Sequence, residues 1–212
     1  MLCGTGRRSA RAAFFFAPMT RYGGFSTIRP MSEFVSRAGA KLEFALATFA
    51  IDVTGFLCAD LGANAGGFLD CLLRRGAKKI YAIDTGYGML DWKLRNDSRV
   101  IVMERTNAMH AQLPEKMNLV TIDVAWTRQK HILPAARNML RGQATVISLI
   151  KPHYEAEAKM LRKGVLRPEH LQTVLEKVKH DIAAAGFEIV NLAQSPIKGA
   201  KGNAEFLAQL RL

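Results

Sequence analysis

The sequence predicts one α/β domain with a doubly wound, mostly parallel sheet of seven strands, in which the last strand runs antiparallel. Two observations lead to this class. Short apolar runs alternate along the chain with amphipathic segments of helical period, as they do in strand–helix–strand units. Hydrophobic residues make up 49% of the 212 residues, which is enough for one full-sized core.

The regular alternation begins after Pro30. Helices are expected where apolar residues recur every three or four positions, and strands where four to six apolar residues follow one another. Because only a loop separates the last two strands, they should pair antiparallel. The expected strands are 56–61, 80–83, 100–103, 119–122, 145–150, 187–192 and 205–212, and the expected helices are 35–49, 68–75, 131–140 and 171–185.

Residues 1–32 lack a clear period, so the predicted domain covers residues 33–212. The segment holds five arginines and no acidic residue, a composition typical of a mitochondrial presequence. It equally suits a disordered arm, or sequence upstream of a true start at Met19 or Met31. These alternatives stay open, and a cytoplasmic location is expected unless the segment is a presequence.

The charge of the chain favours a polyanionic partner. Thirty basic and 18 acidic residues give a net charge of +12, as expected of a nucleic-acid binder, although many basic proteins bind no RNA. Three cysteines without a CxxC pair argue against a disulfide scaffold or a cysteine zinc site. The five histidines show no ligand spacing, so no metal is expected, and no apolar run approaches the ~20 residues of a membrane helix.

The first strand-to-helix turn is the most informative segment. Residues 60–68 read Asp-Leu-Gly-Ala-Asn-Ala-Gly-Gly-Phe, which matches neither the GxGxxG dinucleotide fingerprint nor a Walker loop. The spacing fits S-adenosylmethionine better, a ligand without phosphates. Asp84 ends the next strand, where a carboxylate can accept the hydrogens of both ribose hydroxyls. Taken singly, an aspartate after a strand is more often a helix cap or a turn residue.

Six motifs carry a resemblance to a known family. They are SRAGAKLE (36–43), DLGANAGGF (60–68), DTGYGMLDWKLR (84–95), ERTN (104–107), IDV (122–124) and KGNAEFL (201–207). Together they resemble the hemolysin-A (TlyA) family, a branch of the FtsJ-like ribose 2′-O-methyltransferases that act on ribosomal RNA. The similarity runs from about Val35 to the C-terminus and implies a Rossmann-like methyltransferase fold.

The resemblance implies a Lys-Asp-Lys-Glu catalytic tetrad at Lys41, Asp123, Lys151 and Glu205. It also implies S-adenosylmethionine as cofactor and RNA, either ribosomal RNA or a ribosomal subunit, as partner. The implied donor-site residues are Asp60, Gly62, Ala63, Asn64, Gly66, Gly67, Phe68, Asp84 and Asn107. The family's S4 RNA-binding module would not fit into the 32 residues ahead of the domain. Ala40 before the first lysine and Ala125-Trp126-Thr127 after Asp123 also depart from the family pattern.

Two roles are open for Lys151. It can act as the general base that removes the ribose hydroxyl proton, or as a fixed cation that stabilises a developing alkoxide. Asp123 and Glu205 would orient the lysines and the hydroxyl. The expected phosphate contacts are Lys198, Lys201, Arg162, Lys163 and Arg167, and the possible stacking residues are Tyr87, Trp92, Trp126 and Tyr154, although core packing is expected for both tryptophans.

The expected activity is therefore ribose 2′-O-methylation of RNA by a monomer. Three alternatives remain open: a non-catalytic RNA-binding protein with the same fold, a methyltransferase for a small molecule or protein, and a pore former, as the family's name suggests. The retained tetrad argues against the first, and RNA binding that weakens steeply with salt would argue against the second. The lack of a membrane-spanning run argues against the third.

Overall fold

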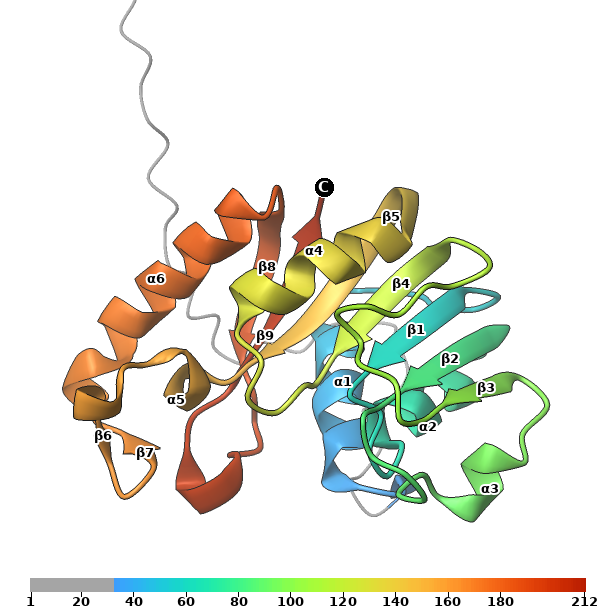
Figure 1. Cartoon of the computed structure of the whole chain (residues 1–212), viewed down its shortest axis with the longest axis horizontal. Helices are drawn as coiled ribbons and strands as arrows, with labels where there is room; N and C mark the ends of the chain where they lie inside the picture. Colours follow the sequence, from blue (N-terminus) through green and yellow to red (C-terminus); the bar gives the residue numbers. More distant parts are fainter. Residues whose placement is uncertain (1–32) are drawn as a thin grey trace, which may run out of the picture.

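The computed structural model describes residues 33–212 and shows a central sheet covered by helices on both faces (Figure 1). The predictions for residues 1–32 lie outside the described part of the chain. The main sheet has the strand order β3-β2-β1-β4-β5-β9-β8, which confirms the predicted seven-stranded α/β architecture. Its strands are β1 (Leu57–Leu61), β2 (Lys79–Ile83), β3 (Val100–Met103), β4 (Met117–Ile122), β5 (Leu140–Ile150), β8 (Glu188–Gln194) and β9 (Phe206–Arg211).

The order of the strands reverses beside β1. This strand pairs parallel with β2 on one side and with β4 on the other, so the carboxyl ends of β1, β2, β4 and β5 meet at one edge. Ligands bind at such a switch point in open α/β sheets. As predicted, β9 runs antiparallel, and it lies between β5 and β8.

Six α-helices and three short 3₁₀ turns accompany the strands in residues 33–212. Ser36 caps the first helix by accepting a hydrogen bond from the backbone N–H of Ala38 at 3.3 Å. The helices are α1 (Arg37–Thr48), α2 (Gly67–Arg74), α3 (Trp92–Arg95), α4 (Gln129–Met139), α5 (Pro152–Glu155) and α6 (Leu171–Ala184), and the 3₁₀ turns are η2 (Ala158–Met160), η3 (Pro168–His170) and η4 (Ala200–Gly202). None of the described helices is long and apolar enough to cross a bilayer.

Two hydrophobic cores lie on opposite faces of the sheet. Successive strand residues point to opposite faces, so Cys58 joins one core and its neighbour Ala59 the other. Helices α1 and α2 cover the first core, and α4 and α6 cover the second (Figure 1). The sheet is thus fixed from both sides, and its carboxyl edge is left for polar groups.

The structure differs from the predicted elements in three places. Strand β5 begins at Leu140, which the helical period places in the preceding helix, because Leu140 pairs with Met117 across a register shift. The short helices α3 and α5 were not predicted. The hairpin of β6 (Leu161–Arg162) and β7 (Val165–Leu166) was also missed, since strands of two residues show no period.

The junction of α1 and α2 leaves no room for a side chain at Gly67. A Cβ there would lie 2.2 Å from Ser36 Oγ and 2.9 Å from the Gly39 nitrogen. Both helices start at this contact, beside the carboxyl end of β1, and run from there toward the amino ends of β1 and β2. The close approach therefore fixes α1 relative to the first strand-to-helix turn.

Asp60 is an ionisable group inside the core below that turn. Its side chain is 1% exposed, Oδ1 accepts a hydrogen bond from Thr121 Oγ1 at 2.8 Å, and Oδ2 has no hydrogen-bond partner among the described residues. Burial raises the pKa of Asp60 to about 7, with the Thr121 hydrogen bond opposing the shift. Asp60 therefore sits behind the turn and is not exposed at the edge.

We predict that Gly67→Ala destabilises the protein by about 1–3 kcal/mol, because overpacking forces α1 and α2 apart. Urea unfolding of both variants measures this. Gly142→Ala is the matched control, since a Cβ at Gly142 meets nothing within 4 Å, and it should shift stability by less than about 1 kcal/mol. Equal stability of the two variants would contradict the close packing of the two helices.

We predict that Asp60 makes stability fall as pH rises. Below about pH 4 its carboxyl is protonated in both states; between about pH 4 and 7 only the unfolded chain ionises, which favours unfolding. The difference in unfolding free energy between Asp60→Asn and wild type should therefore shift in favour of the variant over this range. Above pH 7 this difference should stay constant. Asp52→Asn is the control. Hydrogen bonds from Thr54 lower the pKa of this exposed group, so its stability relative to wild type should not rise with pH. A pH-independent Asp60→Asn difference would refute the burial effect.

Candidate active site

The glycine turn after β1 closes tightly over the edge of the sheet. Gly62 and Gly66 have φ of 89° and 95°, a region that favours glycine. A Cβ at Gly62 would lie 2.7 Å from the Asp123 carbonyl oxygen, so the turn after β1 touches the turn after β4. The absence of side chains at these positions lets the turn after β4, and the side chains of Leu90 and Leu94, pack closely against the glycine turn.

Asp84 ties the end of β2 to the same turn. Its two carboxylate oxygens accept hydrogen bonds from the backbone N–H groups of Asn64 at 2.9 Å and Gly86 at 2.7 Å. Each oxygen keeps a further lone pair, and the side chain remains partly exposed. The carboxylate is therefore held in one place with acceptor capacity to spare, as ribose hydroxyls require.

The other predicted donor-site residues fall into two groups. Asn64 and Asn107 are exposed, and Asn107 Oδ1 accepts a hydrogen bond from the Met109 N–H at 3.0 Å. Ala63, Gly67 and Phe68 are buried, so they shape the turn from below. With a carboxylate acceptor, a side-chain-free backbone and no lysine in the turn, the residues present fit a nucleoside without phosphates, as S-adenosylmethionine is.

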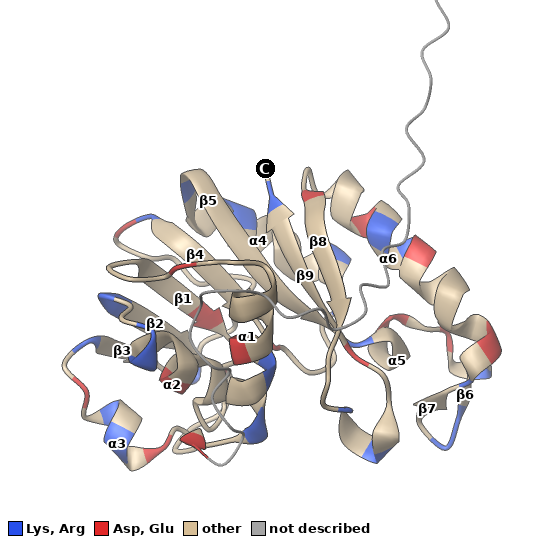
Figure 2. Cartoon of the chain, turned by 180° about the vertical axis from the view of Figure 1, so that it is seen from behind, with Lys and Arg blue, Asp and Glu red and all other residues tan. Residues whose placement is uncertain are grey.

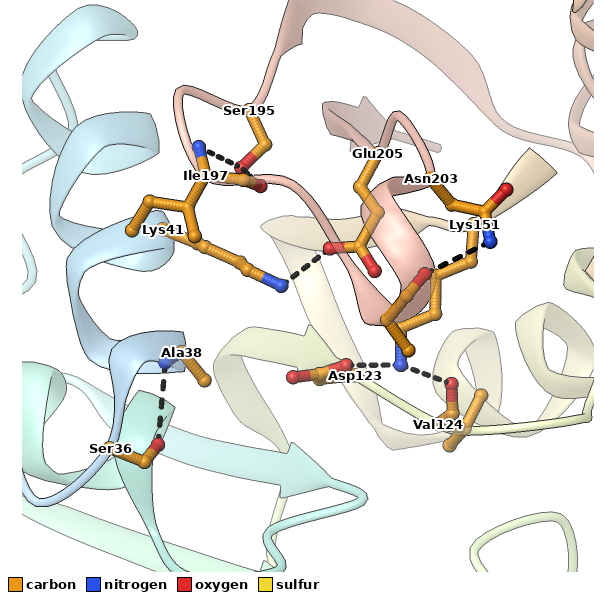
Figure 3. A network of polar contacts seen from close by, with 11 residues as sticks. Ser36, Ala38, Lys41, Asp123, Val124, Lys151, Ser195, Ile197, Asn203 and Glu205 are labelled. Atoms are coloured by element: carbon orange, nitrogen blue, oxygen red, sulfur yellow. Dashed lines mark hydrogen bonds and ion pairs between the residues drawn. The ribbon is translucent and has the colours of Figure 1, made fainter. Parts of the chain in front are cut away.

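The four tetrad side chains meet as two ion pairs (Figure 3). Lys41 Nζ on α1 lies 2.5 Å from Glu205 Oε2, which directly precedes β9. Lys151 Nζ, at the end of β5, lies 2.6 Å from Asp123 Oδ1 at the end of β4 and donates a hydrogen bond to the Val124 carbonyl at 2.9 Å. Residues up to 164 positions apart in the chain thus converge at the carboxyl edge.

The charges of the two ion pairs act on one another, as the pKa of Asp123 shows. Burial raises the pKa of Asp123, the Lys151 and Lys41 cations oppose that shift, and the Glu205 carboxylate adds to it. Gly199 closes the far side of Glu205, since a Cβ at Gly199 would lie 2.0 Å from Glu205 Oε1. The arrangement alternates cations and anions in a site largely removed from water.

Sequence reasoning missed His153 and Asn203. His153 is 7% exposed, its Nδ1 has no hydrogen-bond partner among the described residues, and its ring packs on Tyr154. Burial lowers the pKa of His153, the Lys151 cation adds to this, and the Glu205 carboxylate opposes it. Only its position just after Lys151-Pro152 could have indicated a place beside the tetrad, because histidine spacing bears on metal sites alone.

The expectation that both tryptophans pack in the core was wrong. Trp92 is 74% and Trp126 82% exposed, and Tyr87 is exposed with the Arg105 guanidinium 4.2 Å from its ring centroid. Trp92 begins a single-turn helix and Trp126 lies in a loop, so neither belongs to an amphipathic face. Residues 33–212 also contain no cluster of three histidines, cysteines or carboxylates suited to a metal ion.

Comparisons with known proteins show to which family the fold belongs. The FtsJ-like methyltransferase family matches residues 34–212. Bacillus subtilis YqxC, provisionally named an rRNA methyltransferase, is 42% identical over 186 residues, which are 84% of this chain and 65% of YqxC. Mycobacterium tuberculosis TlyA, named a 16S/23S rRNA (cytidine-2′-O)-methyltransferase, is 38% identical over 84% of this chain and 68% of its own. The chain thus spans about two thirds of the length of these relatives.

A solved structure shares the fold in detail. A Lactococcus lactis protein, provisionally described as a hemolysin, superposes with a TM-score of 0.80 at 39% identity, covering 84% of this chain and 88% of that one. The family match spans the sheet, the glycine turn and all four tetrad positions. The chain therefore belongs to the FtsJ-like methyltransferase family, whose methyl donor is S-adenosylmethionine.

Proposed function

We propose that this chain methylates a ribose 2′-hydroxyl of ribosomal RNA, with residues 33–212 as its catalytic domain. The observation that carries the proposal is the convergence of Lys41–Glu205 and Lys151–Asp123 beside the glycine turn. The name of the TlyA relative, an rRNA (cytidine-2′-O)-methyltransferase, supports the choice of acceptor. A net charge of +12 suits a polyanionic substrate.

The glycine turn and Asp84 would hold the methyl donor. S-adenosylmethionine, when bound, supplies an electrophilic methyl group on a positively charged sulfur. Asp84 would accept hydrogen bonds from the ribose hydroxyls with its remaining lone pairs, and the exposed Asn107, in the loop after β3, would contact the nucleoside. Asp60 would act from below, by fixing the turn through its contact with Thr121.

Lys151 is the residue best placed to meet the acceptor hydroxyl. An ammonium group has three hydrogens, and two of them are directed at Asp123 and the Val124 carbonyl. The third is available to an acceptor oxygen, which would make Lys151 a fixed cation that stabilises negative charge on this oxygen while the hydroxyl proton passes to solvent water. The alternative role, general base, requires a neutral Lys151 amine that takes this proton.

The remaining groups of the site would position the acceptor. Lys41 and Glu205 face Lys151 and Asp123 across the site, so the reacting hydroxyl would lie within a fixed polar frame. Holding both reactants in this geometry lowers the entropic part of the barrier. Trp126, exposed three residues after Asp123, offers a flat surface on which a base can stack.

The proposal also bears on assembly and location. All four tetrad side chains come from one chain, so a monomer suffices. A ribosomal RNA substrate puts the enzyme in the cytoplasm, or in mitochondria if residues 1–32 are a presequence.

We predict that Lys151→Ala lowers turnover by about 10²-fold or more while donor affinity changes little. Transfer of a labelled methyl group to ribosomal RNA measures turnover, and calorimetry measures donor binding. Lys151→Arg separates the two roles, because it keeps a cation but accepts no proton. Lys159→Ala is the control, because this side chain is 77% exposed and pairs with Glu157 on the surface. Undiminished turnover in Lys151→Ala would overturn the tetrad assignment. If wild type binds ribosomal RNA but transfers no methyl group to it, the chain is better described as a non-catalytic RNA-binding protein.

We predict that Asp84→Ala weakens donor binding by about ten-fold or more, since hydrogen bonds to a carboxylate contribute about 1.5–3 kcal/mol. Calorimetric titration with S-adenosylmethionine gives the dissociation constant. The control is Asp97→Ala, whose carboxylate pairs with Arg99 before β3 at the opposite edge of the sheet. Equal donor affinity in Asp84→Ala and wild type would remove Asp84 from the donor site.

A further inference from the structure

One buried side chain joins two loops that are far apart in the sequence. Asn203, 3% exposed, accepts a hydrogen bond from the Leu166 N–H at 3.0 Å and donates to the carbonyls of Gly164 and Ala200, both at 3.0 Å. It therefore connects the β6–β7 hairpin to the η4 turn. Figure 1 shows both segments on the side of the molecule where β5 ends.

The two loops have a further direct contact. Lys201 Nζ donates a hydrogen bond to the Lys163 carbonyl at 3.2 Å, and the backbone of Lys201 is left-handed, with φ of 55°. Within η4, the Gly199 N–H donates to the Asn203 carbonyl at 2.8 Å, which closes the turn on itself. Hairpin and turn thus form one unit, which we call the basic loop pair (residues 161–167 and 198–203).

The basic loop pair is strongly and uniformly charged. It holds five cations and no acidic residue, and all five are exposed. Figure 2 shows blue positions in the β6–β7 hairpin. Among the described residues, none of the five forms an ion pair with a carboxylate at contact distance. The cations are Arg162, Lys163, Arg167, Lys198 and Lys201, and the hairpin cations also line a hollow of about 880 Å³ against η3.

The same unit is linked to the tetrad. Asn203 lies two residues before Glu205, and Gly199 of the turn packs against the Glu205 carboxylate. A shift of the basic loop pair would therefore move Glu205 and, through it, the Lys41 ammonium. The backbone of residues 199–205 therefore belongs both to the basic loop pair and to the site that contains Glu205.

We propose that the basic loop pair binds backbone phosphates of the RNA substrate and that Asn203 holds it in register with Glu205. Unpaired, exposed cations on a preformed surface bind phosphates without reading sequence. Asn203 acts here as a positioning residue, since the hydrogen bonds of its side chain within residues 33–212 all go to the two loops. The inference rests on the proposed function for the identity of the polyanion, but its binding measurements do not require turnover.

The charge part is tested with Arg162→Gln/Lys163→Gln. Filter binding of a ribosomal RNA fragment over a salt series should show weaker binding and a salt slope lower by about 2, because two phosphates are no longer neutralised by the protein. Lys78→Gln/Arg211→Gln removes the same charge at the opposite edge of the sheet and should leave affinity and slope unchanged. An equal effect of the two double variants would overturn the proposed surface, because only total charge would then matter.

The positioning part is tested with Asn203→Ala, and with Asn203→Asp if the alanine variant fails to fold. Donor affinity, measured by calorimetry, should stay at the wild-type value. RNA affinity should fall, kcat should fall with it, and removal of the hairpin charges should cost less than in the wild-type background. If the losses of RNA affinity from Asn203→Ala and from removal of the hairpin charges simply add, the link to Glu205 is refuted. A wild-type kcat in Asn203→Ala would refute it as well. If wild type binds RNA but transfers no methyl group, the proposed function fails while the affinity and salt measurements still decide the surface.

Discussion

The site depends on the pairing of each lysine with one carboxylate across separate elements. A lysine at a largely dry sheet edge is costly unless a partner compensates its charge, and the cost of losing one partner exceeds the value of the pair. Lys41 and Glu205 bring α1 against β9, and Lys151 and Asp123 join the ends of β5 and β4. Besides the role proposed for it in the reaction, each pair therefore restricts how the surrounding elements can pack.

The same restriction explains why small residues surround the charges. Gly62 lets the Asp123 backbone approach the first turn, Gly67 lets α1 approach α2, and Gly199 gives Glu205 room for its carboxylate. At each of these positions a methyl group would displace one charged partner or the helix that carries it. The glycines around the site are thus used for close approach, and at Gly62 for a left-handed backbone as well.

Much of the fold could be predicted from the sequence, because its long strands and helices have clear periods. β1 and α6 are examples, since each buries one or two complete faces. The hairpin β6–β7 could not, because side chains from elsewhere, Asn203 above all, hold it in place. The exposure of Trp92 and Trp126 was missed for a related reason: the general tendency of tryptophan to be buried says nothing about a residue in a loop or a single-turn helix at the surface.

The candidate site was predictable only in part. Asp84 could be placed by the rule that ligands bind at the carboxyl ends of strands. No local pattern relates Lys41 to Glu205, 164 residues away, so their meeting was expected from the family resemblance alone. Asp60 belongs to the same motif as the glycine turn, but whether its carboxylate faces a ligand or the core depends on Thr121 in the neighbouring strand.

The place of β9 in the sheet has a consequence for the order in which the protein matures. β8 contacts the sheet only through β9, which is made after it and inserts between β5 and β8. A chain translated only as far as β8 already contains Lys41, Asp123 and Lys151 but has neither Glu205 nor the strand that joins its two parts. The nascent polypeptide therefore lacks both the Lys41–Glu205 ion pair and the strand between β5 and β8 until β9 has emerged and folded.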